Sequence, residues 1–280
     1  MRLRGRRGSR NIEDRRGRGG GGAAGGLGVA GVLAVLAIGY FTGIDVTPLL
    51  QGQDPFAQGG ETRAPTPEEE EAAQFASRVL ATTEEAWAQI FPDQLGLEYD
   101  PPVLVLFSGR TQSPCGGASG ATGPFYCPAD GKAYLDTAFF ATLSRQLGAK
   151  GDFAAAYVIA HEVAHHVQDE LGILPEVNAR RQAAGERQAN ALTVRLELQA
   201  DCLSGVWASH VESLLDPGDI DEALNAARRI GDDYLQKRAG RTPQPHTFTH
   251  GTSEQRSRWF ATGYRSGAVR DCDTFAATRL

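Results

Sequence analysis

The amino-acid sequence predicts a mainly helical domain with a small β-sheet, an α+β fold, behind one N-terminal transmembrane helix. Three observations lead to this prediction. Residues 19–44 contain no charge, the long segments 152–171 and 190–214 favour helices, and the apolar run Val103–Phe107 has the length of a buried strand. The chain has 280 residues, 41% hydrophobic and 22% charged, and this composition is ordinary for a folded globular protein.

The uncharged stretch contains the apolar run Leu27–Phe41, which with its Gly- and Ala-rich flanks can cross a bilayer core that requires about 20 residues. We therefore predict a transmembrane helix over residues 26–44; a cleaved signal peptide and a soluble core helix are the alternatives. Arg-rich sequence precedes it, and the positive-inside rule orients the helix. The predicted location is the cell membrane, with a single pass, a basic cytoplasmic segment at 1–25 and residues 45–280 outside.

Charge is divided unevenly along the chain. Eight Arg against Glu13 and Asp14 give residues 1–18 a net charge of +6. Because the whole chain carries −6, residues 19–280 carry −12. A nucleic-acid-binding protein has a basic surface, and the sequence provides none beyond the extreme N-terminus, so nucleic acid is not an expected partner.

Residues 45–66 are rich in Pro and Gly and are predicted to form a linker to a domain over 67–280. Thr66 and Pro67 followed by acidic residues are typical of a helix start, and this helix should run to about Phe91. After the strand Val103–Phe107 and a Gly- and Pro-rich region, Lys132–Asp136 is a second candidate strand. Further helices are expected over 137–147, 152–171, 176–184, 190–214 and 221–238, and from about Ser253 onward.

The predicted helix 152–171 contains His161-Glu162-Val163-Ala164-His165, which is the H-E-x-x-H pattern. Residues four apart lie on one face of a helix, so both imidazoles can bind one metal ion. Glu162 lies beside them and can take a proton from a water molecule that zinc has made more acidic. The apolar lead-in makes this helix a buried one, where unpaired His and Glu would be costly, so we predict one Zn²⁺ per chain.

A catalytic zinc site commonly has three protein ligands, so a third ligand is needed. The metzincin arrangement is excluded because it requires a His where Leu171 stands and a Met later in the chain, which has none after Met1. Glu197 with Asp201 one helical turn later is the favoured pair, with Glu197 as ligand and Asp201 as acceptor for a ligand His. Glu212 and Asp216 have the same spacing and are the alternative; Glu197 would then be an exposed acid paired with Arg195 or Arg187.

The C-terminal loop contains His250, which could donate to the oxyanion that forms when water attacks a carbonyl group. Arg256 could hold this loop or a substrate carbonyl group. A solvent-exposed loop histidine is the simpler explanation of His250, and Tyr264 is a second candidate donor.

Several longer motifs carry a resemblance to a known family. They are Ser9–Gly17, Gly123–Asp130, Tyr134–Asp136, His161–His165, Glu197–Cys202, Trp259–Tyr264 and Cys272–Phe275. In these motifs, and over nearly its whole length, the chain resembles the bacterial putative neutral zinc metallopeptidases, which are membrane-anchored. That family is in turn similar to gluzincins, including the membrane prenyl-protein peptidases.

The resemblance implies a zincin-like metallopeptidase domain. In gluzincins the Glu of an E-x-x-x-D helix is the third zinc ligand, and Glu197 stands at that position. A later His, followed six residues on by Arg, assists the oxyanion there, and His250 and Arg256 have this separation. Gly251 departs from the prenyl-peptidase pattern, which has Pro after that His.

Four Cys in an extracytoplasmic domain favour disulfides and allow three pairings. We expect Cys115–Cys127, which closes a glycine-rich loop, and Cys202–Cys272, which links the E-x-x-x-D helix to the C-terminal tail. Four reduced, buried thiols are the alternative.

These features together predict a membrane-anchored zinc metalloendopeptidase that hydrolyses a protein or peptide of the cell envelope, with Glu162 as general base. Two other functions stay open. One is a catalytically silent, zinc-containing binding module of the cell envelope, and the other is a hydrolase of a non-peptide bond.

Overall fold

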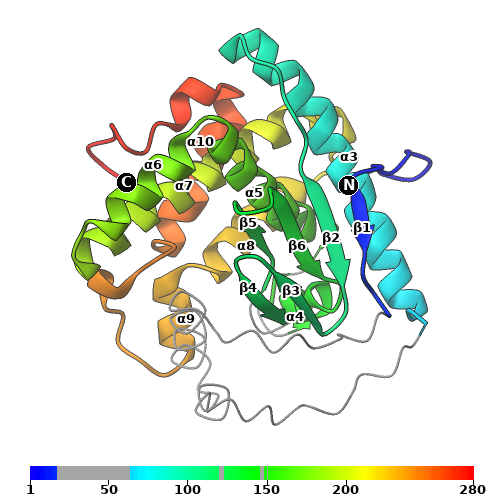
Figure 1. Cartoon of the computed structure of the whole chain (residues 1–280), viewed down its shortest axis with the longest axis horizontal. Coiled ribbons are helices and arrows are strands. Elements are labelled where there is room, and N and C mark those ends of the chain that lie inside the picture. Colours follow the sequence, from blue (N-terminus) through cyan, green and yellow to red (C-terminus); the bar gives the residue numbers. More distant parts are fainter. Residues whose placement is uncertain (18–63, 120–122, 146–147, 150) are drawn as a thin grey trace.

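Helices are the main secondary structure among the described residues of the computed structural model, and they pack beside a small four-stranded sheet (Figure 1). The structure describes residues 1–17, 64–119, 123–145, 148–149 and 151–280. The helices are α3 (Pro67–Ile90), α4 (Phe139–Arg145), α5 (Asp152–Glu170), α6 (Ile173–Gln182), α7 (Glu186–His210), α8 (Asp219–Arg229), α9 (Asp232–Arg238) and α10 (Ser253–Ser266). Shorter helical turns are η1 (Phe91–Leu95), η2 (Glu212–Leu214), η3 (Pro245–Thr247) and η4 (Val269–Cys272). The predicted class, mainly helical with a small sheet, is confirmed.

The main sheet contains four strands in the order β1-β2-β6-β5. The strands of the structure are β1 (Ile12–Asp14), β2 (Val103–Phe107), β3 (Arg110–Ser113), β4 (Gly116–Ser119), β5 (Phe125–Cys127) and β6 (Lys132–Asp136). β1, β2 and β6 are parallel, whereas β5 runs antiparallel to β6 and forms an edge. β3 and β4 form a separate antiparallel pair. The two predicted strands are confirmed as β2 and β6, and the sequence analysis misses the other four.

Helix starts follow their capping residues. The Thr66 hydroxyl accepts a hydrogen bond from the Glu69 backbone N–H at 3.3 Å, and the Glu69 carboxylate accepts one from the Thr66 N–H at 2.7 Å. This reciprocal capping box confirms the predicted start of α3. Thr252 and Gln255 form a second capping box, which starts α10 at Ser253 as predicted.

Two predicted helices differ from the structure. The helix expected over 221–238 is divided into α8 and α9 at Gly231, where a Cβ would lie 2.4 Å from the backbone nitrogen of Ser253. The helix expected from 176 begins at Ile173, because Pro175 fits a first helical turn, in which the N–H groups have no helical partner. The remaining predicted helices are present, with ends shifted by four residues or fewer.

Residues 1–17 pack against the same domain as the residues after 64, and Figure 1 shows β1 beside β2. Leu3 lies in the core with 5% of its surface exposed, and Asn11 donates a hydrogen bond to the Glu84 carboxylate at 2.8 Å. Four of the arginines interpreted as a topology signal pair with acids instead, and Arg15, for example, lies 2.8 Å from Glu13. Strands of one sheet cannot lie on opposite sides of a membrane, so the predicted single-pass localisation, with a cytoplasmic N-terminus and an external domain, is wrong.

Among the helices of the described ranges, none combines the length and the apolar character needed to cross a membrane. The predicted transmembrane segment 26–44 and nearly all of the predicted linker 45–66 lie outside the described residues.

α7 and α10 approach each other closely at two glycines. A Cβ on Gly205 of α7 would lie 2.1 Å from the backbone oxygen of Phe260, and one on Gly263 of α10 would lie 1.8 Å from that of Cys202. Because both obstacles are backbone atoms, they cannot be relieved by a change of rotamer. Only glycine at these positions permits this helix crossing, which brings the side chains of α10 next to those of α7.

Both predicted disulfides are present. Cys115–Cys127 has an S–S distance of 2.07 Å and joins the turn between β3 and β4 to β5. Cys202–Cys272 has an S–S distance of 2.03 Å and joins α7 to η4, just after α10. The second disulfide therefore links α7 covalently to the segment that follows α10.

We predict that Gly263→Ala lowers the free energy of unfolding by about 2 kcal/mol or more, because the added methyl group overpacks a backbone contact. The measurement is thermal or denaturant unfolding followed by circular dichroism. Gly117→Ala is the matched control, since a Cβ at Gly117 of β4 meets its nearest neighbour at an ordinary 3.5 Å. Equal stability of the two variants would contradict the proposed close crossing.

Candidate metal centre

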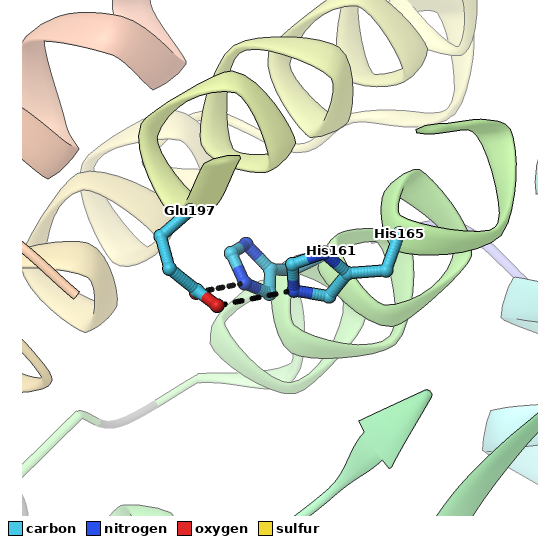
Figure 2. A group of neighbouring side chains, drawn as sticks. All are labelled: His161, His165 and Glu197. Atoms are coloured by element: carbon cyan, nitrogen blue, oxygen red, sulfur yellow. Dashed lines mark hydrogen bonds and ion pairs between the residues drawn. The ribbon is translucent and has the colours of Figure 1, made fainter. Parts of the chain in front are cut away.

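The two histidines of the H-E-x-x-H pattern lie on α5, a helix buried along most of its length. Their ring centroids are 4.8 Å apart, as expected for residues separated by one helical turn. Figure 2 shows that both imidazoles point toward Glu197, which belongs to the neighbouring helix α7. Side chains from two packed helices therefore converge on one point.

The Glu197 carboxylate lies between the two imidazoles. Its Oε2 is 3.1 Å from His161 Nε2, and its Oε1 is 3.5 Å from His165 Nε2. Ligand atoms from the three residues all lie within 4.8 Å of one another, so the three side chains could hold one metal ion together. Glu197 is only 14% exposed and is not paired with Arg195, which donates to the backbone oxygen of Ala277 at 3.2 Å.

The electrostatics of this group suit a cation. Burial opposes a charge on His161, but its contacts with Asp201 and Glu197 outweigh burial and raise the pKa of the imidazole to about 9. Burial alone would raise the pKa of Glu197, yet the charge of His165 and the hydrogen bond with His161 hold it well below its ordinary value. The site therefore favours a positive charge between these side chains, and the donor set of two imidazoles and a carboxylate fits zinc.

The alternative pair, Glu212 and Asp216, lies elsewhere. Glu212 accepts a hydrogen bond from the Tyr264 hydroxyl at 3.4 Å, and Asp216 pairs with the amino group of Met1 at 3.2 Å. Among the described residues, neither of these acids belongs to a group that could hold a metal ion, whereas Glu197 does. The contact with Glu212 also occupies the hydroxyl of Tyr264, the second candidate oxyanion donor.

Asp201 follows Glu197 by one helical turn and is completely buried. Its Oδ1 lies 3.0 Å from His161 Nδ1, although the angle between these groups is not that of a regular hydrogen bond. The same Oδ1 accepts a hydrogen bond from the Tyr157 hydroxyl at 2.5 Å. This close contact on Nδ1 orients the ring so that Nε2 faces Glu197. Asp201 thus lies where the sequence analysis expects an acceptor for a ligand histidine.

Arg256 pairs with Asp201 from α10. Its Nε and Nη2 donate to the two carboxylate oxygens at 2.8 and 2.9 Å, and only 2% of Arg256 is exposed. Its Nη1 also donates to the backbone oxygen of Ile230 at 3.3 Å. Bidentate geometry of this kind is strong and directional, so Arg256 positions Asp201 and, through it, His161.

Gln168 contacts Nδ1 of His165 as Asp201 contacts Nδ1 of His161. This role of Gln168 was not predicted from the sequence. Its Oε1 lies 2.9 Å from His165 Nδ1, while its Nε2 donates to the backbone oxygen of Leu196 and to Gln199 Oε1. Gln199 in turn donates to the backbone oxygen of Cys272 at 3.2 Å. A fully buried amide three residues after a candidate ligand on a helix is the signal that could have identified Gln168.

Glu162 faces a cleft of about 1090 Å³, which the three metal-binding side chains also border. Burial raises the pKa of its carboxyl group, against the opposing charge of His165. Glu162 does not belong to the group that could hold a metal ion. The two imidazoles of α5 meet Glu197 of α7 on a neighbouring part of the α5 surface. The Glu162 carboxylate is therefore placed to act on a molecule in the cleft.

His250 borders the same cleft from the loop before α10. Asp232, 1% exposed, accepts hydrogen bonds from the backbone N–H groups of Thr249, His250 and Gly251 at 2.8, 2.6 and 3.0 Å. Its other oxygen is 3.2 Å from His250 Nδ1. The His250 side chain is 47% exposed. Its partial withdrawal from solvent opposes a charge, but Asp232 and the charge of Glu197 outweigh this and raise the pKa of the imidazole.

His166 lies outside the metal-binding group, as expected from its direction on the helix. Its Nε2 donates to the backbone oxygen of Asp100 at 2.6 Å, and its Nδ1 lies 3.1 Å from the Tyr126 hydroxyl. Burial lowers the pKa of this imidazole. His166 is therefore a buried structural residue.

All of these residues lie within one family match. The family model described as "Putative neutral zinc metallopeptidase" matches residues 1–275. The chain belongs to this family. The match includes residues 1–17, in agreement with their place in the folded domain. The zinc that the family name implies suits the group of His161, His165 and Glu197.

Bacterial relatives extend the similarity over most of the chain. "Uncharacterized protein YpfJ" of Escherichia coli K12 is 49% identical over 239 residues, which are 85% of this chain and 82% of the relative. "Uncharacterized protein Rv2575" of Mycobacterium tuberculosis H37Rv is 42% identical over 219 residues, which are 72% of this chain and 71% of the relative. No solved structure matches this chain.

We predict that Glu197→Ala weakens zinc binding by more than ~100-fold, because it removes a ligand. Loss of a residue that only hydrogen-bonds to a ligand typically weakens metal binding by ~10- to 100-fold. Zinc content after dialysis, with a competing chelator to measure affinity, tests this. Glu212→Ala, at the alternative acid, should keep the wild-type zinc content. The reverse order of the two variants would refute the assignment.

Proposed function

We propose that this member of the family is a zinc-dependent endopeptidase in which Glu162 is the general base. One observation carries the proposal: three residues that could hold a zinc ion and a separate buried carboxylate border the same cleft. A metal site that only stabilised the fold would commonly have a fourth protein ligand and no cleft. This zincin-like arrangement is instead suited to reaction with a molecule from solution.

Zinc at this site would make a bound water molecule more acidic and polarise the carbonyl group of a substrate. His161, His165 and Glu197 would hold the ion, while Asp201 and Gln168 fix the orientation of the imidazoles. Glu162 accepts the proton of the attacking water and returns it to the amine that leaves. The raised pKa of its carboxyl group suits a residue that must both accept and release a proton near neutral pH.

His250 is the proposed donor to the oxyanion. Its Nδ1 donates to Asp232, and the ring borders the cleft. In the protonated imidazole, which the contact with Asp232 favours, Nε2 also carries a proton and can donate. Arg256 acts indirectly in this proposal, since its guanidinium group is bound to the buried Asp201. We therefore assign His250 to transition-state stabilisation and Arg256 to positioning.

The edge of the sheet supports a peptide as the substrate. β5 is an edge strand that pairs with β6 on one side only, and residues on and around β5, including Pro124, Phe125 and Tyr126, line the cleft. An extended peptide can add to such an edge through backbone hydrogen bonds. This mode of binding holds a peptide in the extended form that exposes its carbonyl groups.

We predict that Glu162→Gln retains zinc but lowers hydrolysis by ~10² or more, because Gln keeps the size of Glu and cannot accept the proton. The measurement is mass-spectrometric detection of new termini in a proteome-derived peptide library, with zinc content determined in parallel. Near wild-type cleavage by the zinc-loaded variant would reject the mechanism. Hydrolysis of esters or other bonds but not of peptides would reject the peptidase assignment.

We predict that His250→Ala also retains zinc and lowers kcat by ~10² with a smaller change in KM, because an oxyanion donor acts mainly in the transition state. Steady-state kinetics on a peptide from the library screen would measure this. His246→Ala is the control, since His246 is an exposed residue of the same loop region. An equal effect of both substitutions would show a general disturbance of the loop instead.

A further inference from the structure

One charged side chain of the cleft has no part in the proposed reaction. The charged or titratable groups with a role there are His161, Glu162, His165, Glu197, His250 and Arg256. Arg181 of α6 also lines the cleft. Since a guanidinium group stays protonated at any physiological pH, Arg181 adds a permanent positive charge to the cleft.

Arg181 belongs to one face of α6. Leu174, Asn178 and Arg181 have the i, i+4, i+7 spacing of such a face, and all three line the cleft. Leu174 packs with Leu196, which directly precedes Glu197. This face of α6 therefore extends the cleft away from the metal centre.

The hydrogen-bonding capacity of Arg181 is mostly unused. Its Nη1 donates to Asn178 Oδ1 at 3.1 Å, and its Nε, which is buried, has no acceptor among the residues that the structure describes. Its neighbour Arg180, by contrast, lies 3.7 Å from Glu176 on the exposed side of α6. Because Asn178 accepts through Oδ1, its own NH₂ group is left as a further donor beside the guanidinium.

We infer that Arg181, oriented by Asn178, binds a carboxylate of the peptide substrate. A planar guanidinium matches a carboxylate with two parallel hydrogen bonds, and the Asn178 amide adds another donor. The substrate class is then a peptide with an acidic group on one side of the bond to be cleaved. This inference rests on the proposed function and names the substrate of the same site.

The length of α6 sets the position of that group. Leu174 and Arg181 are seven residues apart, about 10 Å along a helix. An extended peptide covers this length in about three residues. Counted from Leu174, the carboxylate should therefore lie about three peptide residues along the cleft, and it can belong to an Asp or Glu side chain or to a C-terminus.

Peptide capture tests the inference without hydrolysis. The zinc-loaded Glu162→Gln protein is immobilised and mixed with random synthetic decapeptides that have either a free or an amidated C-terminus, and the bound peptides are sequenced. Acidic peptides should be enriched about tenfold, the scale of one hydrogen bond to a charged group. Enrichment that survives amidation identifies an Asp or Glu side chain, whereas enrichment lost on amidation identifies the terminal carboxylate.

Two further variants in the same background decide the role of Arg181. Arg181→Gln should abolish the enrichment, and Arg181→Glu should replace it by a preference for basic peptides. Arg180→Gln, the matched control on the exposed side, should leave the enrichment unchanged. No acidic enrichment, or one that persists in Arg181→Gln, overturns the inference.

Wild-type cleavage of the same peptides separates this inference from the proposed function. Capture of acidic peptides through Arg181 without any cleavage would reject the peptidase function and keep the carboxylate site. Cleavage with no preference for acidic peptides would keep the function and reject the site.

Discussion

The buried ion pair between Asp201 and Arg256 is the interaction on which the candidate site depends. Removing two charges from water is costly, and the bidentate hydrogen bonds and the Tyr157 hydroxyl offset this cost only at short distances. Those distances require α7 and α10 to pack at Gly205 and Gly263, where no larger residue fits. Loss of either charge would leave the other buried without a partner beside a metal-binding histidine, so packing and chemistry are coupled here.

The metal centre is held by two separate sets of contacts, one for each histidine. His161 is oriented through Asp201 and Arg256, and hence by the contact between α7 and α10. His165 is oriented through Gln168, whose amide is anchored on α7. The Cys202–Cys272 disulfide joins α7, which contributes to both sets, to η4. Rigid support of this kind keeps ligands within reach of an ion while one side of the centre stays open to the cleft.

Sequence patterns predicted the parts of the fold that local chemistry determines. The capping residue Thr66, the apolar run Val103–Phe107 and the i, i+4 histidines each act over a few residues, and the structure places them as expected. Features that depend on distant partners were not predictable in the same way. β1 is three residues long and polar, so only its pairing with β2 makes it a strand. The role of Gln168 likewise depends on α7, which lies far along the chain.

The parallel pairing of β1 with β2 has a consequence for how the chain folds. Ile12 is opposite Leu104, so the two strands meet only after a long intervening stretch of chain has been synthesised. Closing so large a loop costs conformational entropy before the strand contacts can stabilise the structure. Pairing of strands that are far apart in the sequence is therefore typically a slow step in folding. On the ribosome, β1 emerges early and stays without its partner until β2 follows. The polar residues Glu13 and Asp14 would keep this waiting strand soluble and would limit its association with other nascent chains.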